Sequence, residues 1–175
     1  NLNIEVSNDG GTSFAPITDL RGSANGIPSG PFAIGWDTAA AGLGLGTDTQ
    51  FVLQVTPSDS NGTGTAVQTD VFLDNEAPAI TTRSTNRSAA NVLGDTQTLT
   101  GGALTIDLGL MDNVPDGLAV DVIFPNGPPA GPQRMQPVGG DAFTYLFEVP
   151  DSPGDISYYV IATDLAGNIT RDPSN

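Results

Sequence analysis

The organisation of this chain is decided by one stretch, Leu73-Asp74-Asn75-Glu76-Ala77-Pro78-Ala79-Ile80. It ends one run of alternating apolar residues and begins another, and its proline sets the direction of the strand that follows. Three of its residues carry side-chain oxygen atoms of the kind that bind cations. We interpret the stretch as the joint between two β-sandwiches, residues 1–76 and 77–175, and as the candidate site of a bound ion.

The charge of the chain argues against several classes of partner. It has 20 acidic residues, five basic ones (all arginine) and no histidine, which gives a net charge of −15. Such a surface repels phosphate backbones and anionic lipid and attracts cations, so we expect no nucleic-acid partner. No run of about eighteen apolar residues is present, so we expect no membrane insertion, and no signal peptide is recognisable.

Turn-forming residues favour an all-β fold. The 22 glycines and 14 prolines are spread among Asn, Asp, Ser and Thr, and no window sustains a helical period. Alternating apolar runs recur at short spacing with turn signals between them, a pattern typical of a sandwich rather than of parallel βαβ units. These runs are Leu2–Val6, Phe32–Trp36, Phe51–Val55, Val67–Leu73, Leu104–Leu110, Leu118–Phe124, Phe143–Phe147 and Ile156–Val160.

The two halves are similar enough to be copies of one unit. Phe32–Asp37 corresponds to Phe143–Glu148. Phe51–Asp59 corresponds to Ile156–Asp164 at a constant offset, so that residue 51 matches 156 and residue 59 matches 164. Two copies of one supersecondary pattern predict a tandem array.

The alignment of the halves also predicts that each sandwich is incomplete. Leu2–Val6 takes the place of residues 118–124, so the two strands before 118–124 have no counterpart in the first half. At the other end, Asn175 corresponds to Asp70, and the second half stops before the equivalent of the closing strand. We expect a part of a longer repetitive chain, or a subunit that neighbouring copies complete by strand addition.

Several motifs resemble a known group of domains. Ser7–Phe14, Trp36-Asp37, Phe72–Asn75 and Tyr158–Asn168 are similar to segments of the immunoglobulin-like repeats, of cadherin or fibronectin type III character, of large bacterial secreted and surface proteins. The joint also resembles a cadherin linker, with Glu76 as an additional residue. The resemblance implies two tandem immunoglobulin-like β-sandwiches at an extracellular or cell-surface location.

The candidate metal ligands follow from this architecture. In an immunoglobulin-type sandwich, the second-to-third and sixth-to-seventh strand turns lie at the end where the first strand enters. Acidic and amide side chains on these segments would therefore meet, and Ca²⁺ takes oxygen ligands of this kind. The candidates are Asp74, Asn75, Glu76, Asp112, Asn113, Asp116, Asp164 and Asn168. The alternative is that these residues are present because turns favour Asp and Asn.

The residue inventory argues against an enzyme. Without His, Cys or Lys there is no Ser-His or Cys-His pair, no Schiff base and no soft-ligand zinc site. A carboxylate pair is the one remaining possibility. Its candidates, Asp37 with Asp48 and Asp151 with Asp155, fall in sequences that predict solvated turns. We expect no catalytic residue.

The sequence therefore predicts a structural or adhesive repeat module of a surface or filament assembly, with calcium stiffening the joint. Its expected partners are neighbouring copies or repeats, with surface glycans as a further option. The alternative is a carbohydrate-binding or spacer module of a secreted hydrolase, which would expose a row of aromatic side chains. Most aromatic residues here alternate in phase with apolar neighbours, which indicates core packing, and Tyr159 is the better candidate for exposure.

Overall fold

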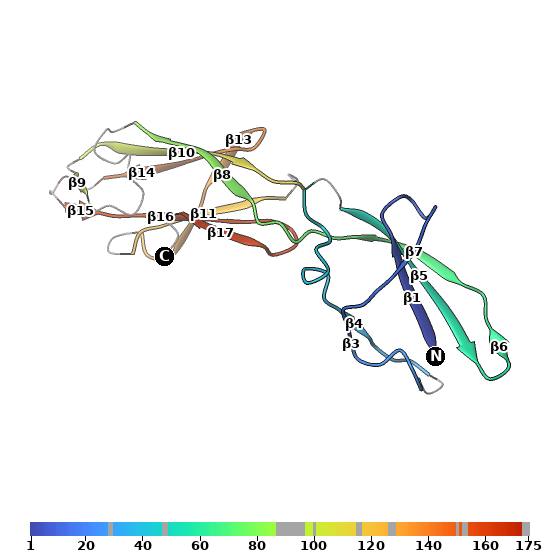
Figure 1. Cartoon of the computed structure of the whole chain (residues 1–175). Helices are drawn as coiled ribbons and strands as arrows, with labels where there is room; N and C mark the ends of the chain where they lie inside the picture. The colour runs from blue at the N-terminus through green and yellow to red at the C-terminus, as the bar shows by residue number, and fades with distance from the viewer. Residues whose placement is uncertain are drawn as a thin grey trace. The chain divides into compact units, whose positions relative to one another are not determined.

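The fold is all-β in the part of the chain that the structure describes. The computed structural model describes residues 1–27, 30–46, 49–86, 97–99, 101–114, 117–125, 129–149, 151 and 154–172. Within these ranges every regular element is a strand and every pairing is antiparallel. These ranges hold no helix of the length and apolarity needed to span a membrane. The chain divides into two compact units, Asn1–Glu76 and Ala77–Asn175 (Figure 1).

The second unit has two four-stranded sheets, with the orders β13-β14-β10-β8 and β12-β11-β16-β17, which Figure 1 shows as two layers. A short two-stranded sheet joins β9 and β15. The strands are β8 (Ala79–Thr85), β9 (Gln97–Leu99), β10 (Ala103–Met111), β11 (Ala119–Ile123), β12 (Pro132–Arg134), β13 (Gln136–Gly139), β14 (Ala142–Glu148), β15 (Gly154–Ile156), β16 (Tyr159–Thr163) and β17 (Ile169–Asp172).

The core of the second unit lies between its two sheets. Every second residue of a strand points to the same face, so the apolar alternation read in the sequence becomes one buried layer from each sheet. The ring of Phe124 stacks on that of Phe147 with centroids 4.8 Å apart. The buried side chains include Leu104, Ile106, Leu108, Leu110, Val120, Val122, Phe143, Phe147, Tyr158, Val160 and Ala162.

The first unit has one larger sheet and one short hairpin. The sheet has the order β2-β1-β5-β6, with β7 also paired to β5, and β3 pairs with β4. The strands are β1 (Leu2–Ser7), β2 (Ala15–Pro16), β3 (Leu20–Arg21), β4 (Gly35–Trp36), β5 (Gln50–Asp59), β6 (Gly62–Thr63) and β7 (Val67–Phe72).

The strand pairing confirms that one pattern occurs twice. In the first unit β5 lies between β1 and β7, and in the second unit β16 lies between β11 and β17. Val55 pairs with Val67, and Val160 pairs with Asp172. Both members of the second pair are 105 positions beyond those of the first, so the register is preserved along with the strand order.

One strand differs from the prediction. The alternation at Phe32–Trp36 predicts a strand over that whole run, but only Gly35–Trp36 forms one. This strand is short because, within the described residues, β4 pairs with β3 alone, whereas β14 pairs with both β13 and β10. β17 pairs with β16 on the side where β7 pairs with β5, and the two strands share the position of Asp172 and Val67. That the second unit lacks the equivalent of the later residues of β7 stays a prediction.

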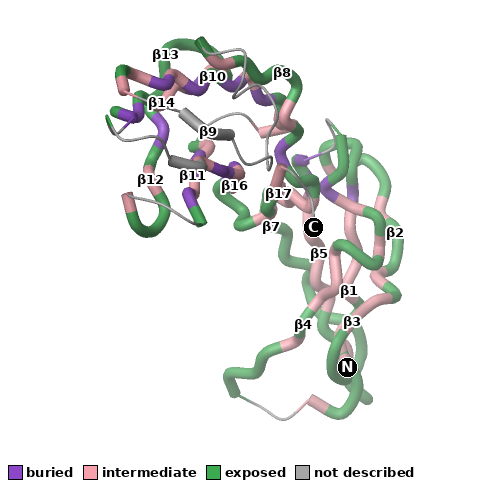
Figure 2. The backbone as a smooth tube through the Cα atoms, turned by 90° about the vertical axis from the view of Figure 1, so that its left-hand side faces the viewer, coloured by how far each residue is buried: buried purple, intermediate pink, exposed green. Residues whose placement is uncertain are grey.

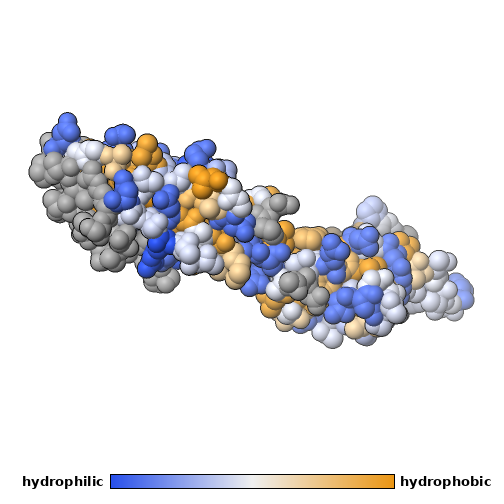
Figure 3. All heavy atoms as spheres, turned by 90° about the horizontal axis from the view of Figure 1, so that it is seen from above, coloured by the Kyte–Doolittle hydropathy of each residue, from blue (hydrophilic) through white to orange (hydrophobic). Residues whose placement is uncertain are grey.

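The units differ most in burial. Figure 2 shows buried residues along β10, β14, β11 and β16, while the first unit is mostly half-buried or exposed. Among the described residues of the first unit, Phe51, which is 3% exposed, is the only buried hydrophobic side chain. On the face drawn in Figure 3, apolar side chains are exposed among hydrophilic ones in both units. In the described part of the first unit, no strand takes the place of β8 or β10.

Candidate metal centre

Two acidic residues of the second unit continue the inward-facing rows of core strands. Asp112 directly follows β10, two positions after the buried Leu110. Asp164 directly follows β16, two positions after the buried Ala162. Since alternate residues share a face, both carboxylates are directed toward the end of the core.

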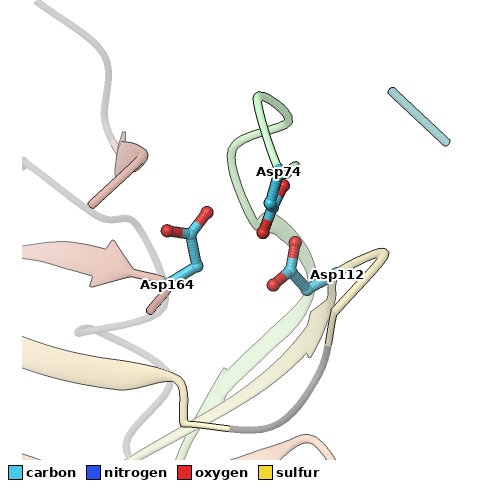
Figure 4. A group of neighbouring side chains, drawn as sticks. All are labelled: Asp74, Asp112 and Asp164. Carbon is cyan, nitrogen blue, oxygen red and sulfur yellow. The ribbon is translucent and has the colours of Figure 1, made fainter. Parts of the chain in front are cut away.

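A third carboxylate lies near these two. Asp74 belongs to the stretch that leads into β8, five positions before Ala79. One carboxylate oxygen from each of Asp74, Asp112 and Asp164 lies within 4.8 Å of the others, and Figure 4 shows the three side chains directed toward one another. The Asp164 residue is only 5% exposed, and the other two are half-buried.

The turn after β16 fixes the orientation of Asp164. The Asn168 backbone N–H donates to Asp164 Oδ1 at 2.8 Å, and Asn168 Nδ2 donates to Oδ2 at 2.9 Å. The Gly167 N–H donates to the Asp164 carbonyl at 3.3 Å, and Gly167 has a φ of 92°, which favours glycine. A carboxylate has about four lone-pair sites, so two accepted hydrogen bonds leave it able to bind a cation.

Asn113 directly follows Asp112, and its side-chain amide is buried without a hydrogen-bond partner among the described residues. Its Nδ2 and Oδ1 atoms are both buried, and within the described residues neither has a hydrogen-bond partner. Leaving a buried amide unsatisfied costs about 1–3 kcal/mol. A bound cation or water that contacts Oδ1 would remove part of that cost.

Asn75 and Glu76 have contacts that the sequence did not predict. Asn75 Nδ2 donates to the Leu43 carbonyl at 2.8 Å and to Thr38 Oγ1 at 3.0 Å. The Gly46 N–H donates to Glu76 Oε2 at 2.6 Å. Both side chains therefore hold the glycine-rich loop of the first unit. Asp116, another candidate ligand, lies outside the described residues.

The glycine-rich loop can approach this stretch because one position has no side chain. A Cβ at Gly44 would lie 2.9 Å from the carbonyl carbon and oxygen of Leu73, and Gly44 has a φ of +70°. The Asn75 N–H donates to the Gly44 carbonyl at 2.8 Å. The alternating glycines of Gly42-Leu43-Gly44-Leu45-Gly46 are the sequence signal that could have predicted this close approach.

The chemistry of the triad fits a hard cation. Two like charges no more than 4.8 Å apart repel by at least about 3 kcal/mol at an effective dielectric constant near 20, and a divalent cation would offset that repulsion. Carboxylate and amide oxygens suit Ca²⁺, Mg²⁺ or Mn²⁺. The chain has no His or Cys to offer the softer ligands that Zn²⁺ prefers.

The acidic residues weighed for catalysis have other contacts or lie outside the described part. Asp37 pairs with Arg21 and accepts a hydrogen bond from the Ala40 N–H at 3.1 Å. That backbone bond and then Arg21 hold the pKa of Asp37 below its ordinary value, so it stays ionised and is a poor general acid. Asp48 lies outside the described residues, as does the side chain of Asp155.

The aromatic residues are largely covered. Tyr158 is 4% exposed, and burial raises its pKa to about 12. The guanidinium of Arg171 lies over the ring of Tyr159, 4.0 Å from the ring centroid. Tyr159 is half-buried. Phe32 and Phe72 are the large aromatic side chains that are exposed in the described ranges.

No protein-family model, curated protein or solved structure matches this chain. Its function has to be argued from the residues and the geometry described above.

Proposed function

We propose that this chain is an extracellular structural or adhesive repeat module, built of immunoglobulin-like sandwiches, that forms part of a surface or filament assembly. The observation that carries the proposal is the internal repeat, in which β1-β5-β7 and β11-β16-β17 share strand order and register. A strand pattern that occurs twice in one chain is typical of repeat proteins, in which each repeat contacts its neighbours and serves as a structural unit. Neighbouring repeats or copies are the proposed partners.

The strand order of the second unit supports the immunoglobulin-like assignment. In chain order, β8, β10, β13 and β14 form one sheet, and β11, β12, β16 and β17 form the other. Immunoglobulin-type sandwiches place their first, second, fourth and fifth strands in one sheet and the others in the second, with a further strand at the edge in some members. The short β9–β15 pair is additional to that scheme.

We further propose that the module binds calcium through Asp74, Asp112 and Asp164. The Asn113 amide oxygen, backbone carbonyls and water would complete a shell of about six to eight oxygens. Extracellular modules bind Ca²⁺ with dissociation constants of about 0.1–1 mM, which matches a site of few carboxylates on turns.

Thermal unfolding with and without calcium tests this site. At a dissociation constant of about 0.1 mM, about 2 mM CaCl₂ stabilises the folded state by about 2 kcal/mol. That raises the midpoint of the second unit by several degrees relative to the same sample in EDTA. The tyrosine signal is the appropriate readout, because all three tyrosines lie in the second unit.

Matched variants identify the ligands. Asp112→Asn and Asp164→Asn should lose the calcium-dependent rise, while Asp141→Asn, an exposed acid of the same unit, should keep it. Asp74→Ala reports whether the connecting stretch contributes. A rise that survives in both Asp112→Asn and Asp164→Asn, or that never occurs in the unchanged chain, contradicts the calcium site.

A further inference from the structure

The sheet of the first unit has an apolar face that lacks the cover present in the second unit. Leu53 and Val55 of β5 are half-buried, whereas their counterparts Tyr158, directly before β16, and Val160, on β16, are 4% and 0% exposed. Val67 pairs with Val55 and is 67% exposed. In the described part of the first unit, this apolar face therefore has no covering layer, and an uncovered apolar face is available for an interaction.

Among the described residues, β4 pairs with β3 alone, so the second edge of β4 is open. The Asp37 N–H donates to the Asp19 carbonyl at 3.1 Å, on the β3 side of β4. In an antiparallel ladder the backbone groups of consecutive residues point to opposite edges, so those of Trp36 point away from β3. In the second unit the corresponding residue, Phe147, pairs with Leu104 of β10.

The aromatic residues near β4 show the consequence of that open edge. Phe32 is 49% exposed, whereas its counterpart Phe143, which pairs with Leu108 of β10, is 7% exposed. Within the described residues the indole N–H of Trp36 is buried and has no hydrogen-bond partner. Trp36 also lines a hollow of about 170 Å³ between β1 and the loop that ends at Leu43.

We propose that the first unit binds an extended β-segment with apolar residues at every second position. This segment pairs as a strand with the open edge of β4 and covers the apolar face of Leu53, Val55 and Val67. The second unit defines the chemistry of this partner, because β8 and β10 occupy that place there and β10 has the sequence Ala-Leu-Thr-Ile-Asp-Leu-Gly-Leu-Met. The inference rests on the proposed repeat architecture and names the partner of its first unit.

A peptide with the sequence of residues 103–111, added to the full chain, is the probe. Trp36 is the sole tryptophan and lies on β4, so its fluorescence reports cover of this edge. The expected result is a saturable shift of the emission to shorter wavelength, with a rise of several degrees in the tryptophan-reported unfolding midpoint. The control peptide carries Ser in place of Leu104, Ile106, Leu108 and Leu110, and it should give neither effect.

Two protein variants locate the binding face. Val55→Asp places a charge on the apolar face and should abolish the response, while Thr56→Asp, on the opposite face of β5 and paired with Asn3, should keep it. Far-UV circular dichroism tests whether Val55→Asp keeps the strand content of the unchanged chain. If it does not, Val67→Asp, at the exposed residue paired with Val55, replaces it as the test variant.

Several outcomes overturn the proposal. These are the absence of a saturable response, an equal response to the serine peptide, or a response retained in both aspartate variants of the apolar face. A concentration-dependent dimer that shifts Trp36 without any peptide assigns the surface to a second copy instead. The calcium experiment on the second unit is independent, so failure of the peptide with success of calcium rejects this inference and leaves the proposed function in place.

Discussion

The two units pair their strands alike and bury their side chains differently. Val55 and Val160 occupy the same place in the same register, yet Val160 is fully buried and Val55 is half-buried. Strand alternation and turn residues are enough to align β1, β5 and β7. A core requires a second layer, because a sheet face is buried only when another element packs on it.

The comparison can be measured because each unit has its own fluorophore. The one tryptophan, Trp36, lies in the first unit, and all three tyrosines lie in the second. Unfolding in urea followed at the two emission bands therefore gives a separate midpoint for each unit. We expect the tryptophan-reported midpoint to come first.

The matched valines test the comparison most directly. Val160→Ala should destabilise the second unit by about 2–3 kcal/mol, since a fully buried position loses both the transferred methyl groups and the packing around them. Val55→Ala should destabilise the first unit by less than about 1 kcal/mol, because its side chain is already partly in water. Urea unfolding measures both, and equal losses would falsify the idea that cover distinguishes the units.

Alkaline pH should weaken the second unit. Burial raises the pKa of Tyr158 from 10.0 to about 12, so between these values the folded unit keeps a proton that the unfolded chain has released. The raised pKa of Tyr158 therefore contributes to the free energy of unfolding fully below pH 10. That contribution falls by roughly 2 kcal/mol as the pH rises toward 12. Circular dichroism melts at increasing pH measure the fall, which Tyr158→Phe should reduce. Burial also raises the pKa of Tyr145, so some fall should persist in Tyr158→Phe.

Asn75 should matter to the first unit alone. Asn75→Ala removes the hydrogen bonds to Leu43 and Thr38 and should lower the stability of that unit by about 1–2 kcal/mol. The tryptophan-reported midpoint measures this loss, and Asn61→Ala, in an exposed turn, is the control. If Asn75→Ala instead removes the calcium response of the second unit, Asn75 is a metal ligand after all.

Acid should weaken the first unit by a smaller amount. Asp9 accepts hydrogen bonds from the hydroxyl groups of Ser13 and Ser7, which lower its pKa far below its ordinary value. The backbone N–H of Asn61 lowers the pKa of Asp59 in the same direction. A depressed carboxyl pKa contributes stability above the unfolded value of 3.8, and that contribution is lost as pH falls below it. The tryptophan-reported midpoint at decreasing pH should show a smaller slope in Asp9→Asn than in the unchanged chain.

Much of the fold could be predicted because it depends on local signals. The alternation of Leu104–Leu110 and Leu118–Phe124 predicts β10 and β11, and the constant offset between the halves predicts the shared register. The length of β4 could not be predicted from Phe32–Trp36, because that length depends on a neighbouring strand. The alternation of apolar residues predicts that a strand forms, but the neighbouring strands with which it pairs determine its length.

The candidate site was predicted in part for a similar reason. Asp112 and Asp164 continue the alternation of core strands, so the sequence places them at one end of the fold. Asn75 and Glu76 lie beside Asp74 in sequence, but their side chains bind the glycine-rich loop. Side chains on neighbouring residues of a linking stretch point in different directions, and no local pattern tells which partner each one finds.

The attachment of Asn75 to the glycine-rich loop has a consequence for a chain under tension. A force that enters the first unit at Glu76 first loads the bonds of Asn75 to Gly44, Leu43 and Thr38. Beyond them, the Leu73 N–H is bonded to the Thr49 carbonyl at 2.9 Å. These bonds share the load before β7 can peel from β5 one pair at a time, so the loop acts as a clamp that raises the force needed to begin unfolding.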